Sequence, residues 1–354
     1  MNNQVLTAAE HLNTISWPNL QKINVPPIKK GDCMLVCAGF EDRTIEALHQ
    51  TSEAGVTGFS LGVIKYLPFY PQNKLEEINT IAQNINLIVK EFEYNREEPA
   101  GIGEKIKDFA CEFNRIFIDI SGMSRLLIVQ ILVALLELEN CSVTILYGEA
   151  DGYPPSKEQF ERDQNNDNDD SPLSYLSYLS SGIFEVATTP ELASVSMFGE
   201  AIRLVVFPSF DPAQLTNLVQ ELQPTYINLI HGIPPAEKNK WRTEAIRRLN
   251  EPTMGPLREE NTTHHEVGTR EYKETLLALL EIYKKRSMFD RIVVAPTGSK
   301  MQAVAVGLFR AVLYDIQIVY PTPKIFTQPD EYTSGMRQLY IVNLPVDKIR
   351  EFNQ

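Results

Sequence analysis

The sequence predicts an α/β protein with two mostly parallel sheets in tandem, and three observations lead to this fold class. First, short apolar runs alternate with amphipathic helical stretches twice along the chain. Second, the apolar runs lack polar alternation, which is typical of strands buried on both faces of a parallel sheet. Third, a chain of 354 residues with 43% hydrophobic and 22% charged residues suits two globular domains better than one.

The first half alternates strands and helices from residue 31 onward. We expect strands at 34–38, 58–66, 87–94, 115–120 and 142–147, with helices at 44–50, 74–84, 102–113 and 124–138. The stretch from Leu126 to Leu138 is strongly apolar, but it is short for a bilayer and contains Gln130 and Glu137. It therefore predicts a buried helix rather than a membrane span.

The second half repeats this order. We expect strands at 203–207, 226–231 and 291–295, and helices at 213–223 and 271–285. In both halves a strand is followed by a small glycine loop, an apolar helix and a strand ending in tyrosine, Tyr147 or Tyr320. The repetition predicts two Rossmann-like, mostly parallel sheets in tandem, produced by an internal duplication.

Domain boundaries follow from the polar segments. Residues 163–170 contain no apolar side chain and several like charges, which predicts a solvated linker. We therefore expect an N-terminal extension at 1–30 and a first Rossmann-like domain at 31–158. A polar linker or insert at 159–182 and a second Rossmann-like domain at 183–354 complete the chain.

Composition narrows the classes of function. The net charge of −13 argues against a general nucleic-acid coat, but not against a small anionic ligand held by local donors. The polar N-terminus does not resemble a signal peptide, so we expect a cytoplasmic protein without a membrane segment. The four cysteines match no zinc motif and are expected to be buried thiols in a reducing compartment. No cofactor or metal is expected.

The first candidate binding loop, Asp119-Ile-Ser121-Gly122-Met-Ser124-Arg125, leaves an expected strand and enters a helix. Open α/β sheets bind ligands at this edge. The serines can cap the helix or donate to an oxyanion, Gly122 permits close backbone approach, and Arg125 can pair with phosphate. Alternatively, Ser124 is only a helix cap and Arg125 pairs with Asp119 to orient the loop.

The second candidate loop occupies the same place in the other half. It carries two hydroxyls, a glycine and a cation at a helix start, in the order Thr297, Gly298, Ser299, Lys300. These are the groups that a phosphate requires. The upstream glycine of a Walker A loop is missing, so the match is to phosphate chemistry in general.

Two further loops could border the same ligand. Glu41, Asp42 and Arg43 follow the first strand, where they could contact a ribose or base, or simply stabilise a helix N-terminus. Tyr147 and Tyr320 could offer aromatic faces for base stacking.

Other polar groups could bind a metal or act as a base. The nearby carboxylates of Glu149 and Asp151 could do either, although exposed loop carboxylates are common. His264 and His265 are expected in a solvated loop, since adjacent histidines point apart on an extended chain.

The spacing Asp119-x-Ser121-x-x-x-Arg125 resembles the motif after the fourth strand of CRISPR-associated Rossmann-fold (CARF) domains. In that family an acidic or amide residue, a hydroxyl and a basic residue in this register contact a cyclic oligonucleotide. The loop 295–300 resembles the threonine–glycine form of this motif, but it lacks the leading Asp or Asn and is one residue short. Two fused halves are similar to SAVED domains, which sense nucleotide messengers in anti-phage signalling.

The resemblance implies a protein that binds a cyclic oligonucleotide between its halves and signals to an effector partner. We also expect a homo-oligomer. No catalytic residue is identified. A ring nuclease or another nucleotide-processing enzyme is one alternative, in which Arg125 or Lys300 stabilises charge during in-line attack by a ribose hydroxyl. A non-catalytic assembly scaffold, which would bind no small ligand, is the other.

Overall fold

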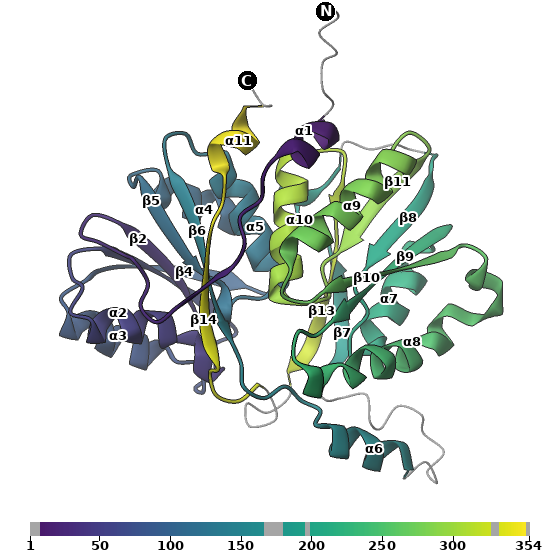
Figure 1. Cartoon of the computed structure of the whole chain (residues 1–354), viewed down its shortest axis with the longest axis horizontal. Helices are drawn as coiled ribbons and strands as arrows, with labels where there is room; N and C mark the ends of the chain where they lie inside the picture. The colour runs from purple at the N-terminus through teal and green to yellow at the C-terminus, as the bar shows by residue number, and fades with distance from the viewer. Residues whose placement is uncertain (1–7, 166–179, 195–198, 327–332, 352–354) are drawn as a thin grey trace, which may run out of the picture. The chain divides into compact units, whose positions relative to one another are not determined.

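The computed structural model describes residues 8–165, 180–194, 199–326 and 333–351. The chain divides into two compact units (Figure 1). Unit 1 comprises Met1–Asp151, Gly307–Tyr314 and Gly335–Gln354, and unit 2 comprises Gly152–Val306 and Asp315–Ser334. Both units contain a sheet with helices on its faces, which confirms the α/β class.

Unit 1 contains a mixed sheet of seven strands in the order β1-β14-β6-β5-β2-β3-β4. Its parallel part consists of β2 (Cys33–Ala38), β3 (Ser60–Leu67), β4 (Ile88–Asn95), β5 (Arg115–Asp119) and β6 (Ser142–Glu149). The connecting helices are α2 (Glu46–Glu53), α3 (Leu75–Asn84), α4 (Ile102–Ala110) and α5 (Arg125–Leu136). Every residue of β2 is buried, as expected for the centre of a sheet covered on both faces.

Two hydrophobic layers hold this sheet. Ala47 and Leu48 of α2 and Ile78 of α3 pack on Val36 and Val63 on one face. Helices α4 and α5 pack against each other, and Phe109 of α4 contacts Phe92 of β4. Helix α5 is buried from Leu126 to Leu136, so it is a core helix as predicted. Within the described residues, no helix is both long and apolar enough to cross a bilayer.

The first unit extends beyond the boundaries that the sequence suggested. Strand β14 (Gln338–Asn343) pairs antiparallel with β6, and β1 (Gln21–Ile23) pairs antiparallel with β14. The two units thus differ from the expected domains of 31–158 and 183–354, because β1 and β14 both join the sheet of unit 1. Two short helices, α1 (Ala8–Thr14) and α11 (Val346–Arg350), also belong to this unit.

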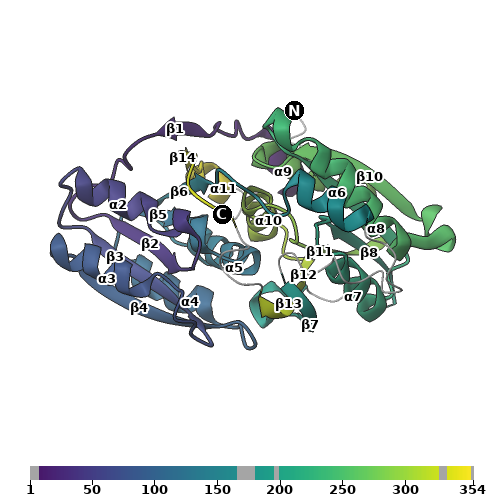
Figure 2. The same cartoon turned by 90° about the horizontal axis from the view of Figure 1, so that it is seen from below.

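Unit 2 contains a five-stranded parallel sheet in the order β10-β9-β8-β11-β12. The strands are β8 (Ala201–Val206), β9 (Tyr226–Ile233), β10 (Thr262–Gly268), β11 (Asp290–Ala295) and β12 (Gln317–Ile318). The helices α7 (Pro212–Leu222), α8 (Trp241–Glu259), α9 (Tyr272–Arg286) and α10 (Lys300–Val312) follow these strands. A separate ribbon pairs β7 (Ser180–Ala187) with β13 (Tyr320–Phe326) (Figure 2).

The two parallel sheets share one topology. When the five parallel strands of each unit are numbered in chain order, both sheets read 3-2-1-4-5. This order is that of the Rossmann-like sheet. The internal duplication stays a prediction, because unrelated α/β domains also share this topology.

Several elements differ from the sequence-based expectation. Helix α8 and strand β10 were not predicted, because Pro252 and Pro256 interrupt the helical pattern and β10 is largely polar. Part of the expected polar linker forms α6 (Lys157–Asn165), whereas 166–179 lie outside the described residues. Tyr320 begins β13 instead of ending a parallel strand. Cys111 is exposed at the end of α4, unlike the other three cysteines.

Candidate functional site

Each sheet has a topological switch point, where the strand order reverses direction. In unit 1 it lies between β2 and β5, and in unit 2 it lies between β8 and β11. Ligands of open α/β proteins bind outside the carboxyl ends of the strands at such points. The candidate loops after β2, β5 and β11 are therefore at the expected edges of their sheets.

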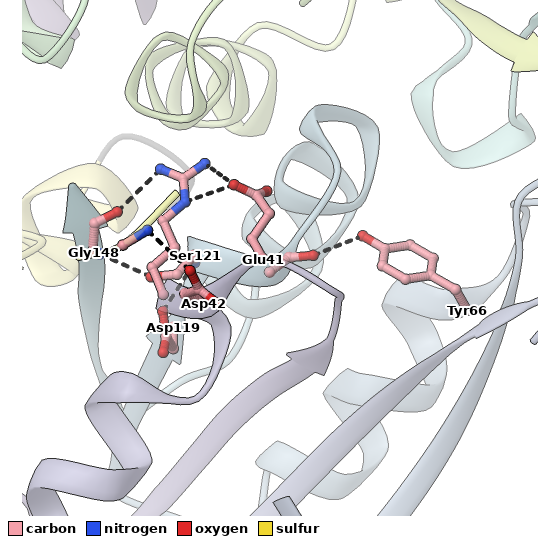
Figure 3. Close-up of polar contacts among 9 residues, drawn as sticks. Glu41, Asp42, Tyr66, Asp119, Ser121 and Gly148 are labelled. Carbon is pink, nitrogen blue, oxygen red and sulfur yellow. Dashed lines mark hydrogen bonds and ion pairs between the residues drawn. The ribbon is translucent and has the colours of Figure 1, made fainter. Parts of the chain in front are cut away.

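Asp119 and Ser121, the first two residues of the expected binding motif, form hydrogen bonds within unit 1. The Asp119 carboxylate accepts a hydrogen bond from the Ser121 amide at 2.9 Å, and the Ser121 hydroxyl accepts one from the Gly148 amide at 2.8 Å (Figure 3). The exposed fraction is 1% for Asp119 and 0% for Ser121. Asp119 therefore orients the loop after β5, and Ser121 joins that loop to β6. The expected pairing of Arg125 with Asp119 stays a prediction.

Gly122 is required by packing between loops. A Cβ atom at this position would lie 2.4 Å from the Cys37 carbonyl oxygen and 2.9 Å from Cγ2 of Thr44. The Tyr66 hydroxyl donates to the Gly122 carbonyl at 3.1 Å (Figure 3). The same hydroxyl accepts a hydrogen bond from the Ser124 amide at 2.6 Å. Close backbone approach at Gly122 thus serves the contact between the β2 and β5 loops.

The start of α5 gathers cationic groups. Ser124 is the N-cap, and its hydroxyl accepts from the Leu127 amide at 3.3 Å. Arg125 lies half-buried in the first turn. The guanidinium carbon of Arg96 is 4.0 Å from the centroid of the Tyr66 ring, whose hydroxyl contacts Ser124. Two arginines from distant parts of the sequence therefore lie near one helix N-terminus.

Sequence reasoning missed Tyr66 and Arg96. Arg96 follows β4 and Tyr66 lies near the end of β3, so both are at the carboxyl edge of the sheet. The available signal was that Tyr66 ends the predicted strand 58–66 and Arg96 follows the predicted strand 87–94. Burial raises the pKa of Tyr66 well above its ordinary value, so its hydroxyl keeps its proton and can both donate and accept.

The acidic loop after β2 is tied to its own unit. Arg43 forms an ion pair with Glu41 at 2.6 Å and donates to the Gly148 carbonyl at 3.1 Å. Their side chains are only 5% and 12% exposed. Asp42 accepts from the Gly335 amide at 2.9 Å. The structure therefore favours the stabilising role for all three residues over contact with a ribose or base.

In the glycine loop of unit 2, the hydroxyl groups of Thr297 and Ser299 form hydrogen bonds within the same unit. The buried Thr297 hydroxyl donates to the Phe207 carbonyl at 2.7 Å. The Ser299 amide donates to the Gln302 side chain at 2.7 Å, and the Gln302 amide donates to the Ser299 hydroxyl at 3.1 Å. This reciprocal pair is a capping box at the start of α10, where Lys300 is the first residue. A Cβ at Gly298 would lie 2.8 Å from Cβ of Phe207, so this glycine also serves loop packing.

The tyrosines expected to stack on a base are buried. Tyr147 stacks on Tyr340 with ring centroids 6.4 Å apart, and Tyr320 is also buried. The Tyr340 hydroxyl donates to Glu149 at 3.2 Å, whereas Asp151 is exposed. Neither tyrosine ring presents an open face, which corrects the stacking role suggested by their position in the sequence.

The histidine pair lies in strand β10, not in a solvated loop. His264 hydrogen-bonds His231 of β9 with a nitrogen separation of 2.9 Å, and His265 lies 3.2 Å from the Asn228 amide. Burial, followed by the charges of Arg247 and His264, lowers the pKa of His231 to about 4. Among the residues that the structure describes, no three His, Cys, Asp or Glu form a group suited to a metal.

No protein-family model matches the chain, and no curated protein is detectably similar to it. Among solved structures, it resembles a functionally unknown protein, PA1789, from Pseudomonas aeruginosa PAO1. The identity is 10%, with 82% of this chain and 92% of that chain covered, and the TM-score is 0.24. A universal stress protein from Archaeoglobus fulgidus DSM 4304 matches with 11% identity, 83% and 97% coverage and a TM-score of 0.22.

A third solved structure is an N,N-8-amino-8-demethyl-D-riboflavin dimethyltransferase from Streptomyces davawensis. It matches with 11% identity, 44% and 40% coverage and a TM-score of 0.22. At such TM-scores the likeness carries no argument about function, which is drawn below from the site itself.

Proposed function

We propose that unit 1 binds the phosphate of a nucleotide at the N-terminus of α5, through Ser124, Arg125 and Arg96. One observation carries the proposal: the Tyr66 hydroxyl accepts from the Ser124 amide while its ring supports the Arg96 guanidinium. Tyr66 thereby brings a cation from the end of β4 to the helix start that already carries Arg125.

The electrostatics favour an anion at this position. A helix N-terminus carries roughly half a positive charge, and arginine can form two parallel hydrogen bonds to phosphate. The chain as a whole has a net charge of −13, which does not favour the binding of anions in general. A small anion is therefore held by local donors, and this edge of unit 1 supplies them.

The finer proposal is that the nucleotide is a cyclic oligonucleotide messenger, and that the bound protein signals to an effector partner in anti-phage defence. It is supported by the spacing of Asp119, Ser121 and Arg125. In this form of the proposal Asp119 and Ser121 orient the loop. The Ser124 hydroxyl and Arg125 contact the ligand, because the Ser124 amide already donates to Tyr66. The cytoplasmic location and the homo-oligomer belong to the same proposal.

The test measures binding by calorimetry to inorganic phosphate, the mononucleotides, and cyclic di-, tri- and tetranucleotides. Arg125→Ala should weaken binding of the best ligand about 10- to 100-fold, the value of a charged hydrogen bond. Arg96→Ala should weaken it in the same direction, and Arg125→Lys should retain part of the affinity. Higher salt should weaken binding by the parental protein.

Two control variants locate the effect. Arg115 lies at the amino end of β5, at the opposite edge of the same sheet, so Arg115→Ala should leave affinity unchanged. Lys300→Ala tests the loop of unit 2, whose donors are occupied by its own capping box. An equal loss with Lys300→Ala would move the site to unit 2.

Chromatography of the recovered ligand separates the remaining functions. Intact ligand supports a sensor, whereas cleaved product supports a ring nuclease that uses the same phosphate site. Absence of binding to every nucleotide, or full affinity in the Arg125→Ala, Arg96→Ala double variant, would overturn the proposal and favour a scaffold.

A further inference from the structure

The loop between β3 and α3, residues 68–74, presents two adjacent aromatic side chains to solvent. Phe69 is 49% exposed and Tyr70 is 39% exposed. Large apolar side chains of this kind are mostly buried, so an exposed pair at a functional edge suggests a contact surface. Because the loop follows the carboxyl end of β3, the pair lies at the edge where the phosphate site is proposed.

Asn73 of the same loop is buried without a partner. Its residue is 5% exposed, yet neither its amide oxygen nor its amide nitrogen has a hydrogen-bond partner in the part of the chain that the structure describes. A buried amide is nearly always hydrogen-bonded in a folded protein, to protein or to a bound molecule. Both atoms are also inaccessible to solvent, so this unoccupied donor and acceptor become available to a ligand only when the loop shifts.

Hydrogen bonds fasten one end of this loop to Arg96 of the proposed phosphate site and the other end to the loop after β2. At its start, the Arg96 amide donates to the Leu67 carbonyl at 3.3 Å, next to the guanidinium that rests on Tyr66. At its end, the Lys74 amide donates to the Gly39 carbonyl at 2.9 Å, in the loop that packs on Gly122. The loop thus runs along the carboxyl edge between Arg96 and the loop after β2.

We infer that the loop 68–74 is the nucleobase subsite of the proposed phosphate site, with Phe69 and Tyr70 as stacking faces. Asn73 is the polar group that contacts the base edge once the loop shifts on binding. The inference rests on the proposed function and adds the recognition of the base to it. Aromatic rings stack on any base, because every base has a π-face. A side-chain amide supplies one acceptor and two donors, which match the mixed donor and acceptor edges of bases.

This assignment replaces the sequence-based choice of Tyr147 and Tyr320, both of which are buried. The assignment also explains why a polar residue occupies the buried position 73. An amide that is unpaired without ligand destabilises the fold, so its presence there is explained if the ligand completes its hydrogen bonds.

The test compares ribose 5-phosphate, which has no base, with AMP, GMP, CMP and UMP on the full-length protein. The parental protein should bind at least one nucleotide 10-fold or more tightly than ribose 5-phosphate. Phe69→Ala, Tyr70→Ala in combination should remove this difference, while affinity for ribose 5-phosphate changes less than about two-fold. As a matched control, Phe289→Ala removes an exposed phenylalanine from unit 2 and should change neither affinity.

Asn73→Leu gives a second, independent readout. Leucine has a similar volume and no unpaired polar atoms, so the ligand-free variant should melt at a higher temperature than the parental protein. The same variant should bind the preferred nucleotide at least five-fold less tightly. A lower melting temperature with unchanged nucleotide affinity would mean that Asn73 holds a structural water, and it would overturn the role given to this residue.

The outcomes separate the two proposals. If ribose 5-phosphate binds the parental protein as tightly as every nucleotide, the base subsite is overturned and the phosphate site stands. If neither ribose 5-phosphate nor any nucleotide binds, the proposed function itself fails. Base-dependent affinity that survives the double aromatic substitution would place the subsite elsewhere and overturn the inference.

Discussion

Replacing Arg43 tests whether the loop after β2 stabilises unit 1 or contacts a ligand. Arg43→Met keeps the length and apolar stem of the side chain but leaves the Glu41 carboxylate without its ion-pair partner at 2.6 Å. It also removes the donor to the Gly148 carbonyl. Breaking a buried pair in this way costs about 3–5 kcal/mol. Because Glu41 retains 12% exposure, we expect the lower end, about 3 kcal/mol.

Unfolding in urea measures this loss in unit 1 alone. The chain has two tryptophans, of which Trp17 belongs to unit 1 and Trp241 to unit 2. In a Trp241→Phe background, fluorescence therefore reports on unit 1, and in a Trp17→Phe background it reports on unit 2. With a slope of about 2 kcal/mol per molar urea, Arg43→Met should lower the midpoint of unit 1 by about 1.5 M.

Two further variants calibrate the result. Glu41→Gln combined with Arg43→Met removes the uncompensated charge and should recover part of the lost stability. Arg248→Met removes an exposed arginine that pairs with Glu244 at 3.2 Å on α8, and should cost less than about 1 kcal/mol in unit 2. The reasoning is refuted if Arg43→Met leaves the midpoint of unit 1 unchanged. Loss of ligand affinity at unchanged stability would restore the contact role expected from the sequence.

Three further changes have defined outcomes. Gly122→Ala should destabilise unit 1 by about 2 kcal/mol, because its Cβ would lie 2.4 Å from a backbone oxygen; an unchanged urea midpoint would show that the loops separate easily. Ser299→Ala should cost about 1 kcal/mol in unit 2 by removing the N-cap of α10, measured from the Trp241 transition. His231 has a folded-state pKa of about 4, which burial and the charges of Arg247 and His264 lower from the ordinary 6.5. The negative charges of Glu266 and Glu244 raise this pKa but do not outweigh the other causes. The unfolded chain therefore binds more protons, and the stability of unit 2 should fall as the pH drops from about 6.5 to about 4. His231→Gln should flatten this pH dependence, whereas His49→Gln, an exposed change in unit 1, should not.

The strands and helices of the parallel sheets could largely be predicted from local pattern. The run Cys33–Ala38 is apolar on both faces, which predicts a strand at the centre of a covered sheet. In the structure this run is β2, and all its residues are buried. The amphipathic helices could be predicted from the helical spacing of their apolar residues, and helix α5 from the length of its apolar run. Strand β10 was missed because its sequence, Thr262–Gly268, is polar, and its pairing with β9 stabilises it more than its own composition does.

Strand pairing across the whole sequence could not be predicted from local pattern. Strand β14 joins the sheet of unit 1 through β6, although Asn343 and its partner Thr144 are far apart in the chain. Local hydrophobic pattern identifies a strand but contains no information on its neighbour. Composition therefore gave no sign that β14 belongs to unit 1.

The sequence by itself determined the α/β class, most of the secondary structure and the loops at the ligand-binding edge of the sheets. The tertiary structure alone decided which polar side chains in those loops are already engaged in hydrogen bonds or ion pairs within the protein. Ser121 and Arg43 are engaged by Gly148, and Tyr66 places Arg96 beside Ser124. A side chain's chemical role depends on its burial and on partners from distant strands, and the spacing of residues within one loop specifies neither.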